Sequence, residues 1–175
     1  MGGSEPDAAP GLTMLARGEM AERVRAFDWA ATPLGAIETW SPSLRFAVDM
    51  VLTTQLPMAL RWGPDLVLIY NDAYAPALGE RHPEYLGVLF KNTSADFQAS
   101  TRALYADLLS GVSRGFVFEK LPYKLMRTHR QETAWFTVSY SPVPDASAPH
   151  GVGGVLISAV EITETVKATQ ELRGV

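Results

Sequence analysis

The stretch LVLIYNDAYAPALG, residues 66–79, passes from an apolar run to an alanine-rich run with only Asn71 and Asp72 between them. The first residues predict a buried strand, and the segment that follows predicts a short helix that stops at Gly79. The polar pair lies where this helix would begin, and the free N–H groups of a helix N-terminus need acceptors. The sequence therefore predicts a strand that runs directly into a short capped helix, with Tyr70 and Tyr74 on either side of the turn.

The composition limits the classes of protein to which this chain can belong. The chain has 175 residues, of which 47% are hydrophobic and 19% are charged, which favours one globular domain with extensions. The net charge is −4 and no basic cluster is visible, so we expect no nucleic-acid partner. No apolar run approaches the roughly 18–20 residues that span a bilayer, and the N-terminus is no signal peptide. We therefore expect a soluble, cytoplasmic protein with no membrane partner.

The absence of cysteine excludes several kinds of functional site. The chain contains none, which excludes disulfides, thiolate metal sites, iron–sulfur clusters, cysteine nucleophiles and thioether-linked chromophores. The three histidines are isolated in sequence, so they form no metal-ligand spacing. No nucleophile motif or acid–base pair stands out, and we predict neither a catalytic residue nor a metal site.

Two helices are expected before the first strand. Residues 1–11 are rich in Gly, Pro and Ala and predict a disordered tail. Met20, Val24 and Phe27 recur at helical spacing and predict a helix over residues 13–27.

The second helix has a clear start signal. Ser41 is a suitable N-cap, and Pro42 suits the first helical position. Its apolar stripe is long, and Pro57 should end the helix. The stripe consists of Leu44, Ala47, Val48, Val51, Leu52 and Leu56. Residues 12–56 thus form a predicted helical leader.

The chain after Pro57 reads as strand, strand, several short helices, and three more strands. MALRWG and LVLIY are the first two strands, the third begins near Phe116 and ends at Met126, and AWFTVSYSPV and VGGVLISAVEI are the last two. The final segment, TETVKATQELR, predicts a helix. Two blocks of strands separated by helices suit an α+β fold, in which helices pack on one face of an antiparallel sheet. A cavity between that face and the helices is the natural ligand site.

The ordered combination of these segments resembles a PAS domain, of the type at the N-terminus of bacterial cytoplasmic sensor histidine kinases. The segments that carry the resemblance are the strand–helix corner YNDAY, the helical leader, the last two strands, and EIT at residues 161–163. The resemblance implies a five-stranded antiparallel sheet over residues 57–163 and an output helix over residues 164–175. EIT is similar to an Asp-x-Thr signal motif, so Glu161, Ile162 and Thr163 are expected to start the output helix. The longer side chain of Glu161 is expected to weaken its contact with Thr163.

The resemblance also implies a function. Such a module senses a small molecule or a partner and passes the signal through a dimeric C-terminal helix to an effector, here a histidine kinase. We expect a homodimer that forms through the N-terminal and C-terminal helices. Two alternatives stay open: a ligand-free dimerisation or protein-interaction module, and a small α+β enzyme with a cone-shaped cavity.

The candidate pocket residues are mostly aromatic. Each tyrosine has an apolar body and one polar group, which suits the orientation of a small ligand, although a core position is the simpler explanation for each. Phe136 and Val138 share a strand face with Tyr140, and the first strand is expected to close the same cavity. The candidates are Met58, Leu60, Tyr70, Asn71, Tyr74, Tyr123, Phe136, Val138 and Tyr140.

No cofactor is predicted. The flavin-binding relatives use a cysteine and two asparagines, and by pattern the asparagine positions fall at Pro122 and Phe136, which cannot form such hydrogen bonds. Haem requires an axial ligand, most often a histidine. We expect His82, His129 and His150 to lie in exposed loops, so haem is not expected either.

Overall fold

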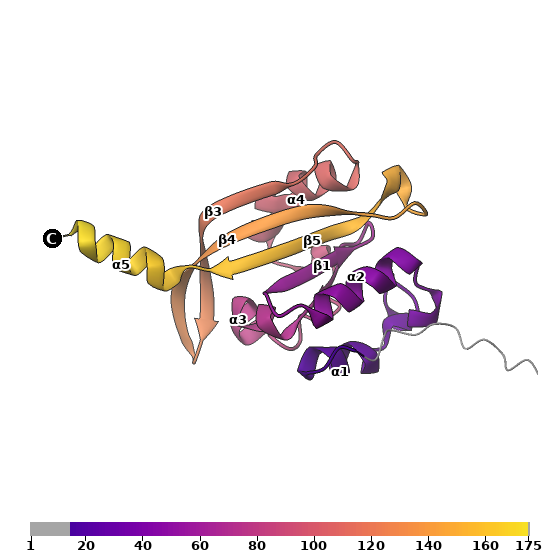
Figure 1. The fold of residues 1–175 in the computed structure, drawn as a ribbon, viewed down its shortest axis with the longest axis horizontal. Coiled ribbons are helices and arrows are strands. Elements are labelled where there is room, and N and C mark those ends of the chain that lie inside the picture. The colour runs from indigo at the N-terminus through magenta and orange to yellow at the C-terminus, as the bar shows by residue number, and fades with distance from the viewer. Residues whose placement is uncertain (1–14, 175) are drawn as a thin grey trace, which may run out of the picture.

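A five-stranded antiparallel sheet with the order β2-β1-β5-β4-β3 forms the centre of the protein. The computed structural model describes residues 15–174 (Figure 1). The strand bounds are β1 Met58–Trp62, β2 Val67–Tyr70, β3 Phe116–Arg127, β4 Arg130–Pro144 and β5 Val152–Glu161. The predicted α+β class with five antiparallel strands is confirmed. The sequence-based expectation for residues 1–11 lies outside the described residues.

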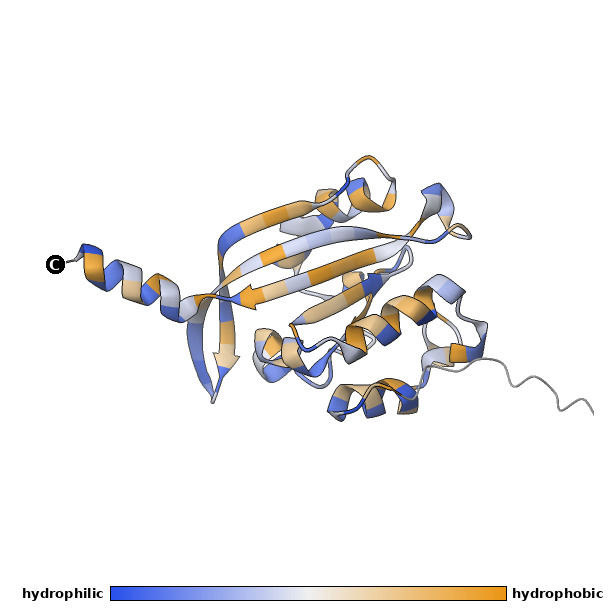
Figure 2. Ribbon diagram, viewed as in Figure 1, coloured by the Kyte–Doolittle hydropathy of each residue, from blue (hydrophilic) through white to orange (hydrophobic). Residues whose placement is uncertain are grey.

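The register divides the sheet into two faces. Arg61 pairs with Leu68 and Val155, and the side chains on this face point toward the helices that follow β2. Its neighbour Leu60 points to the opposite face, which the leader covers. Figure 2 shows that apolar residues concentrate in the central strands, between these two helical layers.

The first helical layer follows β2. It contains η3 (Asp72–Tyr74), α3 (Ala75–Leu78), η4 (Gly79–Arg81), η5 (Phe90–Asn92) and α4 (Ala95–Leu109). The predicted stop at Gly79 is confirmed, because this residue has φ 61° and a Cβ here would lie 2.6 Å from the carbonyl oxygen of Met126. Helix α4 has 15 residues and is longer than the short helices that the sequence predicted. Its buried residues Thr101, Tyr105 and Leu108 face inward.

The leader forms the second layer. It contains α1 (Glu19–Ala26), η1 (Trp29–Ala31), η2 (Ile37–Thr39) and α2 (Pro42–Thr53). The start of α2 is confirmed: Ser41 Oγ accepts from Leu44 N at 3.1 Å. The predicted end is wrong, because α2 stops at Thr53 and Leu56 is 60% exposed rather than part of the buried stripe.

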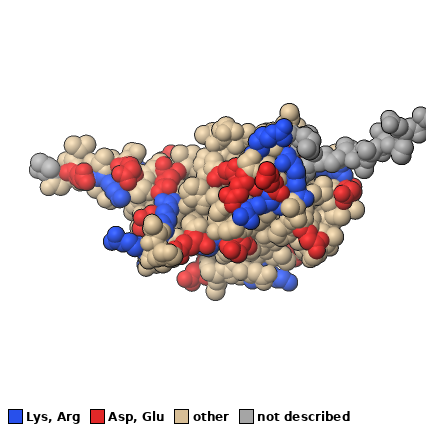
Figure 3. Space-filling model, turned by 90° about the horizontal axis from the view of Figure 1, so that it is seen from below, with Lys and Arg blue, Asp and Glu red and all other residues tan. Residues whose placement is uncertain are grey.

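The predicted start of α1 at residue 13 is wrong in its described part. Residues 15–18 are not helical, and Glu19 is the first helical residue. Figure 3 shows the face that α1 lines, where acidic and basic side chains are interspersed.

The strand–helix corner explains how the leader docks. Asn71 Oδ1 accepts from Tyr74 N at 3.0 Å, so this residue caps the following helical turn as predicted. Asp72 has a different role: its Oδ1 accepts from Met20 N at 2.8 Å, in the first turn of α1. The polar pair therefore caps two helices, one local and one 52 residues earlier in the chain.

The C-terminal helix α5 (Thr163–Arg173) leaves the end of the sheet and projects away from the other elements (Figure 1). Thr163 is its one buried residue. Within residues 15–174, no helix is long and apolar enough to cross a membrane.

Candidate functional site

A cavity of about 500 Å³ lies between the sheet and the helices α3 and α4. We call it the sheet cavity. All five strands contribute side chains to it, and α3 and α4 form the opposite wall. Its apolar lining includes Leu68, Ala77, Leu78, Phe97, Leu125, Phe136, Val138, Ile157 and Ala159. The volume falls in the range of pockets that bind small molecules.

Five tyrosines line the sheet cavity: Tyr74, Tyr85, Tyr105, Tyr123 and Tyr140. Burial raises the pKa of Tyr74 to about 12. Burial also raises the pKa of Tyr105 and of Tyr140 well above the ordinary value of 10. These three phenols therefore stay neutral at ordinary pH and keep their O–H donors.

Tyr105 occupies the middle of this aromatic group. Its ring packs edge-on against Phe90 at 5.4 Å and against Tyr140 at 5.9 Å between ring centroids. Its hydroxyl is buried near the Arg61 guanidinium and has no hydrogen-bond acceptor among the described residues. An unpaired buried hydroxyl is costly, so this one points to a group that the protein alone does not supply.

Arg61 is the second unusual group in the wall of the cavity. The residue is only 4% exposed. Its Nη1 donates to the carbonyl oxygen of Leu66 at 3.1 Å, and its Cζ lies 5.4 Å from the ring centroid of Phe97 and 6.0 Å from that of Tyr105. The ion pairs of the described residues do not include it. A buried cation without a counter-charge is rare, because its desolvation is uncompensated.

The structure brings five of the predicted pocket residues together around the sheet cavity: Tyr74, Tyr123, Phe136, Val138 and Tyr140. Met58 and Leu60 do not line it. They alternate with Ala59 and Arg61 along β1, so their side chains lie on the face that the leader covers. The prediction that they line the cavity is wrong, because neighbouring residues of a strand point to opposite faces of the sheet.

Tyr70 and Asn71 also lie outside the lining of the cavity. Tyr70 is fully buried, and its hydroxyl lies 2.9 Å from His82 Nδ1. His82 is therefore not the exposed loop histidine that we expected, since its Nε2 also lies 3.1 Å from Glu19 Oε1. Tyr70 and Asn71 hold the corner rather than contact the cavity.

Sequence reasoning missed Arg61 and Tyr105. The signal for Arg61 was a charged residue between Leu60 and Trp62 in an otherwise apolar strand. The signal for Tyr105 was its spacing from Thr101 and Leu108, which places the three on one face of a helix.

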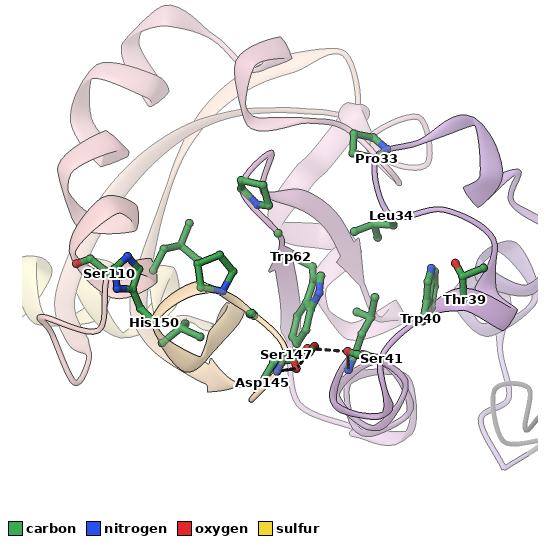
Figure 4. A pocket seen from close by; sticks show the side chains of 18 of the residues that line it. Pro33, Leu34, Thr39, Trp40, Ser41, Trp62, Ser110, Asp145, Ser147 and His150 are labelled. Atoms are coloured by element: carbon green, nitrogen blue, oxygen red, sulfur yellow. Dashed lines mark hydrogen bonds between the residues drawn. The ribbon is translucent and has the colours of Figure 1, made fainter.

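A second cavity of about 530 Å³ lies under the leader, and Figure 4 shows it from close by. Trp40, Trp62 and Leu34 form part of its wall. Its buried carboxylate, Asp145, is only 5% exposed.

Asp145 is satisfied by the protein itself. It accepts from Ser41 Oγ at 2.6 Å, from Ser147 N at 2.9 Å and from Ser147 Oγ at 2.6 Å. Burial would raise the pKa of Asp145, but these hydrogen bonds from Ser147 and Ser41 outweigh it and lower the pKa. The carboxylate fastens the β4–β5 loop to the start of α2, and the sheet cavity is the better candidate for a ligand site.

The predicted signal motif lies at a junction of five elements: α3, β3, β4, β5 and α5. Arg127, at the end of β3, donates from Nη1 and Nη2 to the two carboxylate oxygens of Glu161 at 2.9 and 3.1 Å. Its Nη2 also donates to the carbonyl oxygen of Pro76 in α3 at 2.6 Å. The hydrogen bonds from Arg127 hold the pKa of Glu161 below its ordinary value.

Thr163 completes the junction. Its hydroxyl donates to Glu161 Oε1 at 2.8 Å and accepts from Trp135 N at 3.0 Å. The contact that the longer glutamate was expected to weaken is therefore present. Ile162 N donates to Trp135 O at 2.7 Å, so all three motif residues are tied to the sheet where α5 begins.

The described residues contain no group of three or more His, Asp or Glu side chains that could hold a metal ion. Of the two positions that matched flavin-bonding asparagines, Phe136 lines the sheet cavity and Pro122 does not. His129 is a surface residue with a side chain 95% exposed. That the chain uses neither flavin nor haem remains a prediction.

No protein-family model and no curated protein sequence matches the chain. Solved structures do. A complex of phage VqmA with DPO is 18% identical with a TM-score of 0.50, and the match covers 74% of this chain and 57% of that one. The LOV protein of Rhodobacter sphaeroides is 16% identical with a TM-score of 0.48, covering 73% and 74%. The PAS domain of BvgS from Bordetella pertussis is 16% identical with a TM-score of 0.43, covering 75% and 95%.

The strand order, the antiparallel pairing and the short helices over one face agree with the arrangement that the sequence resemblance predicted. The chain has a PAS fold. At these identities the likeness concerns the fold alone and shows nothing of what the chain binds.

Proposed function

We propose that this PAS domain is a sensory module that binds a small molecule in the sheet cavity and changes the position of α5. The observation that carries the proposal is a cavity of about 500 Å³ whose wall holds a buried tyrosine hydroxyl with no partner among the described residues. The proposal includes no chemical step. It places the chain in the cytoplasm of a bacterium, ahead of an effector of the histidine kinase type.

The route from the cavity to α5 is short. Ala77 and Leu78 of α3 line the cavity, and the carbonyl of their neighbour Pro76 accepts from Arg127. The same guanidinium holds Glu161 at the end of β5, and Glu161 accepts from Thr163, the first residue of α5. A ligand that displaces α3 therefore acts on the ion pair that anchors α5, which biases an equilibrium between two arrangements of this helix.

Ala159 offers a direct test, because it is buried, lines the cavity and lies two residues before Glu161. Ala159→Leu should fill part of the cavity and imitate occupancy. We expect altered hydrogen–deuterium exchange over α5 and, by native mass spectrometry, loss of any small molecule that the purified wild-type protein retains. The matched control is Ser158→Leu, one residue earlier and on the opposite face, which should change neither. A folded Ala159→Leu variant with wild-type exchange over α5 would refute the proposed route.

A second candidate function is a protein-interaction module that needs no ligand. It is favoured by exposed apolar side chains of the leader and β5: Phe46 is 68%, Met50 is 49%, Leu56 is 60% and Val160 is 46% exposed. Leu172, near the end of α5, is 81% exposed. These residues support a homodimer through the N-terminal and C-terminal helices, with α5 stabilised by its copy.

The two candidate functions predict different effects of substitutions in the cavity and on the exposed apolar surface. If dimerisation is the function, Phe46→Ser should weaken self-association in sedimentation experiments, while Ala159→Leu should leave it unchanged. If ligand sensing is the function, Ala159→Leu should alter the dimer or its C-terminal helix.

A further inference from the structure

We propose that the ligand of the sheet cavity is an organic monocarboxylate with a flat apolar body, and that Arg61 binds its carboxylate. This inference rests on the proposed function, since it presumes that a small molecule occupies the cavity. It goes further by assigning the chemical class of that molecule.

The first step is the state of Arg61. A guanidinium presents five N–H donors and stays charged at any ordinary pH. Here the residue is 96% buried, one nitrogen donates to a backbone carbonyl, and no carboxylate of the described residues lies within ion-pair distance. The rings of Phe97 and Tyr105 lie near the cation at 5.4 and 6.0 Å. Such ring contacts offset only part of the desolvation of a buried charge.

The second step is the geometry of the missing partner. A guanidinium matches a carboxylate through two parallel hydrogen bonds, which makes this pair both strong and directional. Tyr105, in α4 on the opposite wall, packs close to Arg61, with its ring centroid 6.0 Å from Arg61 Cζ, and its buried hydroxyl lacks an acceptor among the described residues. A bound carboxylate would satisfy both deficits at once, because it can accept from several donors.

The third step is the count of charges. Arg61 is the buried cation of the lining, and Arg81 and Lys124 are exposed cations at its edge, beside one carboxylate, Asp96. One buried guanidinium matches one negative charge. A dianionic phosphate would leave a second charge uncompensated in the same wall, so the lining favours a monoanion. The excess of positive charge at the edge favours the entry of an anion.

The fourth step is the rest of the cavity. On the same face of the sheet as Arg61, the lining is apolar and aromatic, with Phe136, Val138 and Ile157 from the neighbouring strands. Tyr74, Tyr105 and Tyr140 have hydroxyls but no charge at neutral pH, because burial raises the pKa of each. This surface suits an aromatic or cyclic hydrocarbon body and offers little to a sugar or a polyol, which would need many more hydrogen-bond partners.

The test uses pairs of probes that differ in charge and not in shape. Benzoate, phenylacetate and 3-phenylpropanoate are compared with their primary amides by thermal shift and isothermal titration calorimetry, with the full chain. We expect at least one carboxylate to raise the Tm with concentration and to bind about tenfold or more tightly than its amide, since charge-assisted hydrogen bonds are about twice as strong as neutral ones.

Arg61→Met should abolish this preference and leave the binding of the amide within about threefold. The matched control is Arg102→Met, an exposed arginine whose guanidinium lies over Phe90 at 5.8 Å outside the cavity, and it should keep the preference. Arg61→Lys provides a second variant, which keeps the positive charge but loses the planar guanidinium that can donate two parallel hydrogen bonds to a carboxylate. It should retain only a part of the preference.

The outcomes separate the two proposals. Equal binding of acids and amides would overturn the monocarboxylate class and leave the sensory proposal standing. If neither set binds but α5 responds to Ala159→Leu, the class alone is wrong. If neither set binds and α5 does not respond, both proposals fall.

Discussion

Two buried polar side chains, one in β1 and one just after β2, differ in how many hydrogen bonds the protein offers them. Asn71, just after β2, is 2% exposed, and Arg61 in β1 is 4% exposed. Asn71 has a partner for every polar atom: Oδ1 accepts from Met58 N and Tyr74 N, and Nδ2 lies 2.8–3.1 Å from three carbonyl oxygens of residues 51–56. Arg61 has a single hydrogen-bond acceptor.

The difference indicates what each residue is for. The amide of Asn71 joins the end of α2, the start of β1 and the turn η3, so it fixes where the leader lies against the sheet. A fully satisfied buried network stabilises one arrangement. The hydrogen bonds of Arg61 are incomplete, and the residue lines a cavity. A buried polar group whose hydrogen bonds are all made within the protein is therefore a structural group. One with unused donors is a candidate binding group.

The largest expected effect is on Asn71. Asn71→Ala removes five hydrogen bonds and leaves buried backbone groups without partners, so we expect the free energy of unfolding to fall by about 3 kcal/mol. Urea denaturation followed by circular dichroism measures the loss. Asn92→Ala, at an exposed asparagine, is the control and should change the stability by less than about 0.5 kcal/mol. A loss below about 1 kcal/mol in Asn71→Ala would show that the network is not what holds the leader.

A smaller effect is expected at the Arg127–Glu161 pair, where both side chains are partly exposed, at 23% and 34%. Glu161→Gln should reduce the free energy of unfolding by about 1 kcal/mol at pH 7, because surface pairs contribute little even with good geometry. The pKa of Glu161 lies below its ordinary value of 4.5 in the folded protein. The stabilisation is therefore complete well above pH 4.5 and is lost as the pH falls through the lowered pKa.

Urea denaturation from pH 7 to pH 3 tests this sign. The stability of the wild-type protein should approach that of Glu161→Gln at the acid end. Glu164→Gln, where the side chain is 90% exposed, should track the wild-type protein throughout. A gap between wild type and Glu161→Gln that stays constant with pH would show that the carboxylate charge does not anchor α5.

Local patterns predicted much of the fold. The pair Ser41-Pro42 marked the start of α2, Gly79 marked the end of α3, and the alternation along β4 placed Phe136, Val138 and Tyr140 on one face. These features depend on residues within a few positions of one another, where backbone geometry and side-chain period decide the outcome.

Other features depend on contacts that the sequence does not reveal. Asp72 caps a helix 52 residues away. The prediction that it caps only the helix that follows it in the sequence was therefore incomplete. Strand β1 is buried on both faces, and its pattern cannot show which parity meets the cavity. The sequence therefore predicts Met58 and Leu60 in the cavity and not Arg61, although an arginine in an apolar strand is the less expected residue.

The smallest expected effect is the sharpest test of the comparison. Without ligand, Arg61→Met should change the free energy of unfolding by less than about 1 kcal/mol in either direction, because an apolar side chain of similar length replaces an uncompensated charge. The lost hydrogen bond to Leu66 and the lost ring contacts oppose this gain and are of similar size. Urea denaturation of ligand-stripped Arg61→Met, compared with Asn71→Ala, measures the smallest and the largest of the expected changes in the free energy of unfolding. If Arg61→Met costs as much as Asn71→Ala, the guanidinium is a structural group like the amide, and its unused donors say nothing about a ligand.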